Sequence, residues 1–150
     1  MKYPKITFIV FILFICGIFL LFKIGKKEGE SNDKLLMNNV KIRGVIESIQ
    51  ISNNHCFAII HLKNIETNTK IFNQKLNRKY FPYAIKNGKS EIYAHICDFE
   101  NIGDTIMLNS NEKIITIRQN SNGKKTIRDI GIVSEETDNN YIKLNTKLYK

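Results

Sequence analysis

The chain lacks the short motifs by which common enzyme classes are identified. It contains no G-x-S-x-G, H-E-x-x-H, G-x-x-x-x-G-K-[ST] or G-x-G-x-x-G segment. The serine nucleophile elbow, the zinc-protease helix, the phosphate-binding loop and the dinucleotide fingerprint are therefore all missing. We expect a protein that is not an enzyme and that needs no cofactor.

Cysteine is scarce, with three residues in the whole chain. Cys16 lies in an apolar run, where a thiol behaves as a small hydrophobic side chain. Cys56 and Cys97 remain as a pair, and a pair in an extracytoplasmic domain is a candidate disulfide. Strand alternation places Cys56 among apolar residues and Cys97 among polar ones, so two unbonded thiols are the alternative.

Metal-ligand spacing is also absent. The candidate ligands are His55, Cys56, His61, His95 and Cys97, with His95 and Cys97 on one face of an expected strand. The full zinc pattern, a close C-x₂₋₄-C pair together with an H-x₃₋₅-H pair, is missing, because Cys56 and Cys97 are far apart in the sequence. We therefore predict no metal site.

Charge is missing from one long stretch. Residues 6–22 are all apolar except for Thr7 and Gly17. At about 1.5 Å per residue, the stretch to Ile24 spans roughly 28 Å, close to the hydrocarbon core of about 30 Å. The run is longer than the apolar core of a cleaved signal, and no small-residue cleavage pattern follows it. The sequence predicts an uncleaved transmembrane helix over residues 6–24, with membrane lipid as its partner.

Orientation is not decided by charge. Lysines flank both ends of the span, so the positive-inside rule gives a tie. Only a short arm, residues 1–5, precedes the span, as in a signal anchor. We therefore expect the domain to lie outside the cytoplasm.

Most of the remaining chain has the alternating pattern of β-strands. We predict a juxtamembrane linker over residues 25–39, a small antiparallel OB-like or SH3-like barrel or sandwich over residues 40–133, and a fraying polar tail over residues 134–150. The first strand slips register near Gly44, which predicts a β-bulge. Asn122-Gly123 predicts a type I′ hairpin turn. The expected strands are residues 40–51, 56–62, 69–73, 90–97, 105–108, 113–119, 126–128 and 130–133.

Acidic residues are absent from residues 67–90, where cations and aromatic rings alternate. Such a mixture suits a nucleic-acid groove, an anionic membrane surface or a wall polymer. The structural alternative, which we favour, is that residues 80–83 close the open end of the barrel while the lysines stay solvated. The candidate binding residues are Lys70, Phe72, Lys75, Arg78, Lys79, Tyr80, Tyr83, Lys86 and Lys89.

Three features resemble single-span envelope proteins of Bacteroidetes-type bacteria, a group without an assigned activity. They are the N-terminal span, the strand opening with residues 44–47, and residues 102–106 leading to a strand that ends at residues 114–117. The resemblance implies a bacterial protein with an extracytoplasmic domain, and we expect a single-pass protein of the inner membrane with its domain in the periplasm. It implies nothing about chemistry.

These observations together predict a membrane-anchored, non-enzymatic binding or structural module of the bacterial envelope. An envelope protein or an anionic polymer is the expected partner. The alternative is a cytoplasmic-facing, OB-like nucleic-acid-binding domain that uses residues 67–90, but we do not expect nucleic acid to be the partner.

Overall fold

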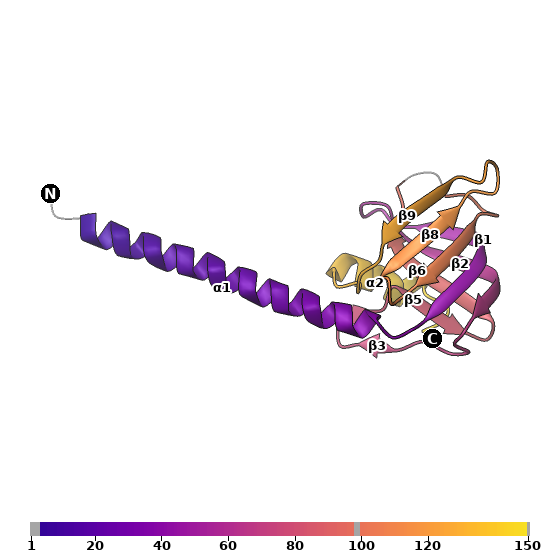
Figure 1. The fold of residues 1–150 in the computed structure, drawn as a ribbon, viewed down its shortest axis with the longest axis horizontal. Helices are drawn as coiled ribbons and strands as arrows, with labels where there is room; N and C mark the ends of the chain where they lie inside the picture. Colours follow the sequence, from indigo (N-terminus) through magenta and orange to yellow (C-terminus); the bar gives the residue numbers. More distant parts are fainter. Residues whose placement is uncertain (1–3, 98–99, 150) are drawn as a thin grey trace.

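The computed structural model describes residues 4–97 and 100–149 and shows one long helix leading into a β-sheet domain (Figure 1). The seven-stranded antiparallel sheet has the order β5-β6-β2-β1-β7-β8-β9, and β3 and β4 form a separate hairpin. This confirms the predicted class of an N-terminal helix followed by a small β domain. The elements are α1 (Pro4–Leu36), β1 (Lys41–Ile51), β2 (Phe57–Thr67), β3 (Lys75–Leu76), β4 (Lys79–Tyr80), β5 (Tyr83–Lys86), β6 (Lys89–His95), β7 (Thr105–Asn109), β8 (Ile114–Arg118), β9 (Lys125–Asp129) and α2 (Glu136–Asn145).

α1 is long and apolar enough to cross a membrane, and its apolar part packs against no other part of the described chain. Its large apolar side chains range from 37% exposed at Ile15 to 76% exposed at Phe22. Leaving such surface in water costs roughly 25 cal/mol per Å². The hydrocarbon of a bilayer would remove that cost.

The predicted linker over residues 25–39 is instead mostly helical, because α1 continues without a break to Leu36. This stretch lacks proline, and Glu30 precedes Lys34 by one turn, a spacing that stabilises helices. Leu36 is buried in the core of the domain. The predicted arm, residues 1–5, lies outside the described residues except for its last two, which begin α1.

The main hydrophobic core lies inside the curved sheet and is formed largely by isoleucines of β1, β2, β6, β7 and β8. β2 is buried on both faces from Phe57 to Leu62. Its near-continuous apolar sequence follows from that position, since each face needs apolar residues. The second face contributes Phe57 and Ile59 to another apolar cluster beneath α2.

Two expected strands are reduced to single bridges. Phe72, in the expected strand 69–73, pairs with Ile85 of β5, and Val133, at the end of the expected strand 130–133, pairs with Tyr80 of β4. β5 and β9 are the two edges of the sheet. The chain from Phe72 to Tyr80 therefore runs from edge strand β5 to the segment that follows edge strand β9.

The type I′ turn predicted at Asn122-Gly123 is not found there. The β8–β9 hairpin exists, but of its Asn122-Gly123 pair only Gly123 has a positive φ, so its turn is not type I′. The loop between β8 and β9 is longer than a two-residue turn and is closed by a hydrogen bond from Gln119 N to Lys124 O. The two-residue turn with two positive φ angles is Asn87-Gly88, which joins β5 to β6.

The segment expected to be a fraying tail is ordered structure. α2 lies against the sheet on the side toward α1 (Figure 1), and Ile142 is fully buried. Leu148, beyond the helix, is 7% exposed and belongs to the same apolar cluster. These two side chains dock the C-terminal segment, which the polar composition did not suggest.

The predicted bulge near Gly44 is confirmed by register shifts in the β1–β2 pairing, one between Arg43 and Val45 and another between Ile46 and Ser48. At Gly44 the neighbouring strand comes close. A Cβ atom there would lie 3.0 Å from Ile65 Cγ2 and 3.1 Å from Leu62 Cβ. A side chain at this position would therefore force Ile65 or Leu62 to move.

We predict that Gly44→Ala lowers the free energy of unfolding by about 1–3 kcal/mol, because the added methyl overpacks the core. Urea denaturation of the detergent-solubilised chain measures the effect. Gly131→Ala is the matched control, since a Cβ there meets no heavy atom within 4 Å. Equal losses in the two variants would contradict the close approach at Gly44.

Candidate functional site

The aromatic members of the basic segment face the protein interior. Phe72 is 8% exposed, Tyr80 4% and Tyr83 0%. The rings of Phe72 and Phe81 meet edge to face at 4.9 Å between centroids. These rings are buried in packing and cannot stack on nucleic-acid bases, as the structural alternative predicted.

The cations of the basic segment divide among different surroundings. Lys75 and Arg78 line one hollow, and Lys70 lines another, beside Asn87 and Gly88. Lys79 forms an ion pair with Glu28 of α1, with 2.6 Å between Nζ and Oε1. The two remaining candidates, Lys86 and Lys89, face each other across the β5–β6 turn. The segment therefore does not form one continuous basic stripe.

The hollow beside β3 and β4 has a volume of about 870 Å³ and is bounded on its other side by α2. α2 adds Lys143 to its lining, and Glu136 is the acidic residue there. Asn139 of α2 donates a hydrogen bond from Nδ2 to the carbonyl oxygen of Arg78, at 2.9 Å, and so fixes the β3–β4 turn. Lys75 Nζ lies 5.2 Å from the centroid of the Tyr80 ring, within cation–π range.

A groove joins this region to α1. Leu76 and Asn77 line both the hollow and the groove, and the opposite wall of the groove comes from α1 between Ile24 and Leu35. Glu28 and Lys79, which form an ion pair, both line this groove. The β3–β4 hairpin therefore lies beside the segment of α1 that directly follows its apolar part.

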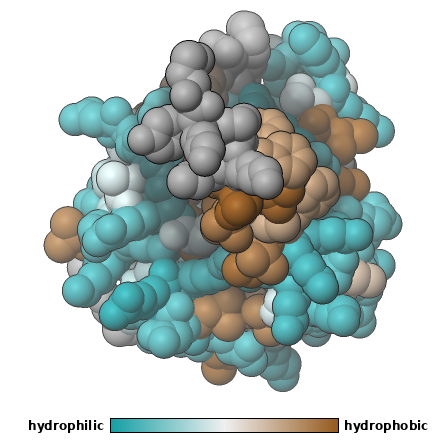
Figure 2. All heavy atoms as spheres, turned by 90° about the vertical axis from the view of Figure 1, so that its left-hand side faces the viewer, coloured by the Kyte–Doolittle hydropathy of each residue, from teal (hydrophilic) through white to brown (hydrophobic). Residues whose placement is uncertain are grey.

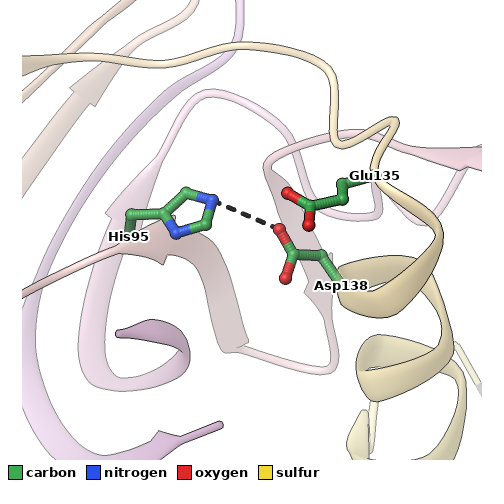
Figure 3. Close-up of side chains that lie close together, drawn as sticks. All are labelled: His95, Glu135 and Asp138. Atoms are coloured by element: carbon green, nitrogen blue, oxygen red, sulfur yellow. Dashed lines mark ion pairs between the residues drawn. The ribbon is translucent and has the colours of Figure 1, made fainter. Parts of the chain in front are cut away.

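A second candidate site joins the end of β6 to the start of α2 (Figure 3). His95 Nε2 lies 3.2 Å from Asp138 Oδ2, and ligand-type atoms of His95, Glu135 and Asp138 all lie within 4.8 Å of one another. Asp138 is buried, whereas the other two side chains are exposed. The three residues line a mainly apolar cleft of about 410 Å³.

Asn54 orients the two carboxylates of this site. Its Nδ2 lies 3.1 Å from Glu135 Oε1 and 2.9 Å from Asp138 Oδ1. Hydrogen bonds from Asn54 and Thr137, and the nearby imidazoles of His55 and His95, lower the pKa of Glu135, so this carboxyl group stays ionised. Glu135 therefore contributes a negative charge to the site at neutral pH.

The loop that carries Asn54 has an uncommon backbone. His55 has a φ of 43° and Cys56 a φ of 58°. Consecutive non-glycine residues with positive φ are costly, at about 1–3 kcal/mol each, and such residues cluster at functional sites.

A buried carboxylate, Glu91, holds the C-terminal segment. Its carboxylate accepts hydrogen bonds from Thr146 Oγ1 at 2.6 Å, from Tyr93 Oη at 2.7 Å and from the Lys147 amide at 2.9 Å. His61 Nδ1 lies 3.4 Å away. Burial alone would raise the pKa of Glu91, but the interaction with His61 and the hydrogen bonds from Thr146, Tyr93 and Lys147 together lower it to about 2. The network is structural, because Glu91 is only 1% exposed.

The two cysteines of the domain lie on adjacent segments. Ile96 N donates a hydrogen bond to Cys56 O at 2.9 Å, and Cys97 Sγ lies 3.8 Å from His55 O. The structure has both cysteines as thiols. A disulfide between Cys56 and Cys97 stays a prediction from the sequence.

The histidines and cysteines considered as metal ligands are not brought together as one group. His61 faces Glu91, whereas His95 faces Asp138. Sequence analysis missed Glu135 and Asp138 because they lie in the expected tail, far along the chain from His95. No spacing signal links residues on separate elements, so only the docked position of α2 reveals the cluster.

No protein-family model, curated protein or solved structure matches the chain. The resemblance to bacterial envelope proteins therefore stays an expectation from the sequence. The functional argument depends on the geometry of the sites described above.

We predict that Glu91→Gln lowers the free energy of unfolding by about 3 kcal/mol at neutral pH. This value follows because folding lowers the pKa of Glu91 from 4.5 to about 2, and each pKa unit corresponds to about 1.4 kcal/mol. The stabilisation by Glu91 is present above pH 4.5 and is lost as the pH falls through the folded pKa of about 2. Denaturant titrations at several pH values should show that the variant lacks this part of the acid dependence.

The control for this prediction is Glu66→Gln. Glu66 is exposed and lies 3.7 Å from Arg43, so its ion pair should contribute at most about 1 kcal/mol. If both variants lose the same stability, with the same pH profile, Glu91 does not stabilise the fold as described.

Proposed function

We propose that the chain is a membrane-anchored, non-enzymatic binding module of the bacterial envelope. Its ligand is an anionic group at the membrane surface, and its binding surface is the basic face formed by Lys75, Arg78, Lys79 and Lys143. The domain is a small, OB-like or SH3-like barrel in this proposal. The observation that carries it is the position of the basic face beside the end of the apolar helix.

The contact between α1 and the β3–β4 hairpin supports this position. Glu28, which pairs with Lys79, is four residues beyond Ile24, the last residue of the predicted span. At about 1.5 Å per residue, the pair lies roughly 6 Å along α1 from the end of the apolar segment. A hairpin at that height would lie at the level of the lipid headgroups.

Surface character supports contact with headgroups in preference to insertion. The view along α1 toward the domain shows a mostly hydrophilic surface around the helix (Figure 2). The hollow contains the cations Lys75, Arg78 and Lys143 and the single acid Glu136. Each cation near an anionic membrane surface contributes about 1 kcal/mol to binding.

The nucleic-acid alternative has lost its main support. Binding of single strands depends on exposed aromatic rings for base stacking. The rings of Phe72, Tyr80 and Tyr83 are buried. The cations alone are better suited to headgroups or to an anionic polymer.

We place the domain in the periplasm, with α1 in the inner membrane. The short arm before the span favours this orientation, as in a signal anchor. Cys97 is exposed, so a membrane-impermeant maleimide should label it in intact spheroplasts, and Cys97→Ser should remove that label. Labelling only after lysis would place the domain in the cytoplasm.

We predict that anionic lipid protects the basic face. In nanodiscs, amide hydrogen exchange of residues 75–80 in the full chain should be slower with phosphatidylglycerol than with phosphatidylcholine alone. The difference should shrink at 1 M salt, where the Debye length is about 3 Å.

Charge reversal tests whether the cations of the basic face cause the lipid-dependent protection. The double variant Lys75→Glu, Arg78→Glu should lose the lipid-dependent protection, whereas Lys124→Glu, Lys125→Glu, on the exposed β8–β9 hairpin, should keep it. Exchange that does not depend on lipid composition in the unaltered chain would refute the proposed ligand.

A further inference from the structure

We propose that His95, Glu135 and Asp138 form a binding site for one divalent transition-metal ion, with Zn²⁺ as the best match. The site is separate from the basic face and does not depend on the proposed lipid contact. One imidazole and two carboxylates are ligands that zinc accepts, and a water molecule from the cleft would supply a fourth ligand. The metal would join the end of β6 to the start of α2.

The hydrogen bond of His95 to a backbone carbonyl supports a ligand role. Its Nδ1 lies 3.1 Å from the carbonyl oxygen of His55. A carbonyl oxygen can only accept, so Nδ1 carries a proton and donates it. Nε2, on the side of Asp138, is then the ring nitrogen that is available to a metal ion. Metal-binding histidines characteristically donate their second ring N–H to a carbonyl or carboxylate oxygen in this way.

Separations within the cluster match a metal site. With zinc–ligand bonds of about 2.0–2.1 Å, two ligands of a tetrahedral ion lie about 3.3–3.4 Å apart. The observed separation of His95 Nε2 and Asp138 Oδ2 is 3.2 Å. Glu135 lies within the same 4.8 Å group, so a small side-chain rotation would bring its oxygen to bonding distance. Its side chain is exposed, and the movement would stretch the hydrogen bonds that Oε1 accepts from Asn54 Nδ2 and Thr137 Oγ1.

The surroundings also leave suitable atoms for the ion. Asn54 Nδ2 holds Asp138 Oδ1 and Glu135 Oε1, which orients both carboxylates from outside the cluster. Asp138 Oδ2 remains on the side of His95, and one carboxylate oxygen of Glu135 lies in the same group of atoms. Asp138 is 2% exposed, and burying a carboxylate is unfavourable unless a cation or hydrogen bonds compensate its charge. An imidazolium at His95 or a metal ion can provide that compensation, and titration with zinc separates the two.

The experiment is a zinc titration of the full chain in detergent micelles after removal of metals with a chelator. A competing chromophoric chelator reports the free zinc. We expect saturable binding of one zinc ion per chain. Glu135→Gln should weaken binding at least about tenfold, because losing even an outer hydrogen-bond partner of a metal ligand typically costs 10–100-fold in affinity. His95→Gln should abolish stoichiometric binding.

Glu136→Gln is the matched control. It removes the same charge from the adjacent exposed residue, which lies outside the cluster, so the affinity should stay within about twofold of the unaltered chain. A general attraction of zinc to the acidic start of α2 would instead weaken binding equally in both glutamate variants. That result would overturn the proposal.

Two further readouts keep the proposal testable if His95→Gln folds poorly. Zinc should raise the melting temperature of the unaltered chain by binding the folded state, and Glu135→Gln should reduce this shift. The absorption spectrum of bound cobalt(II) should lack a thiolate charge-transfer band. Such a band would place the metal at Cys56 or Cys97, and absence of saturable binding would leave His95 and Asp138 as an ion pair; either result overturns the proposed site.

Discussion

The constraint on which the rest of the molecule depends is the continuity of α1 from its apolar segment into the core of the domain. An exposed apolar helix needs a hydrocarbon environment, and Leu36 at the other end of the same helix is 1% exposed in the main core. With α1 anchored in a membrane as proposed, a rigid helix that ends in the core would leave the domain little freedom to move away from the membrane surface. The ion pairs Glu28–Lys79 and Asp33–Lys113 connect the same helix to two further parts of the sheet domain.

The position of α2 has a similar importance for the candidate sites. Ile142 and Leu148 bury apolar surface against the outer face of the sheet, and the Glu91 network fixes the residues that follow α2. With α2 in place, Lys143 reaches the basic hollow and Asp138 reaches His95. Both proposed sites are therefore built from residues that come together only after the C-terminal segment has docked.

The sequence predicted features that depend on local pattern. The apolar run of α1, the bulge at Gly44, the alternation of most strands and the burial of the aromatic residues at 80–83 are all visible in short windows. Each depends on the period or the composition of neighbouring residues. For these features, local preference and tertiary structure agree.

Other features depend on contacts between distant segments and were missed for that reason. Residues 134–149 are docked on the sheet by two apolar side chains, Ile142 and Leu148, in an otherwise polar stretch. Asn87-Gly88 carried the same turn signal as Asn122-Gly123, but only strand pairing distinguishes a two-residue turn from a longer loop. The His95–Asp138 contact has no counterpart in the sequence pattern, because it joins a strand end to a helix start.

The central claim, that one unbroken helix joins the membrane to the domain, can be tested by a distance measurement between two spin labels. The labels are placed at Leu13→Cys, in the apolar part, and at Lys34→Cys, near the domain, in a chain whose three native cysteines are replaced by serine. In nanodiscs, pulsed electron paramagnetic resonance should give one narrow distribution near 32 Å, from 21 residues at about 1.5 Å each. A broad distribution of shorter distances would show a flexible linker after residue 24 and would contradict the account.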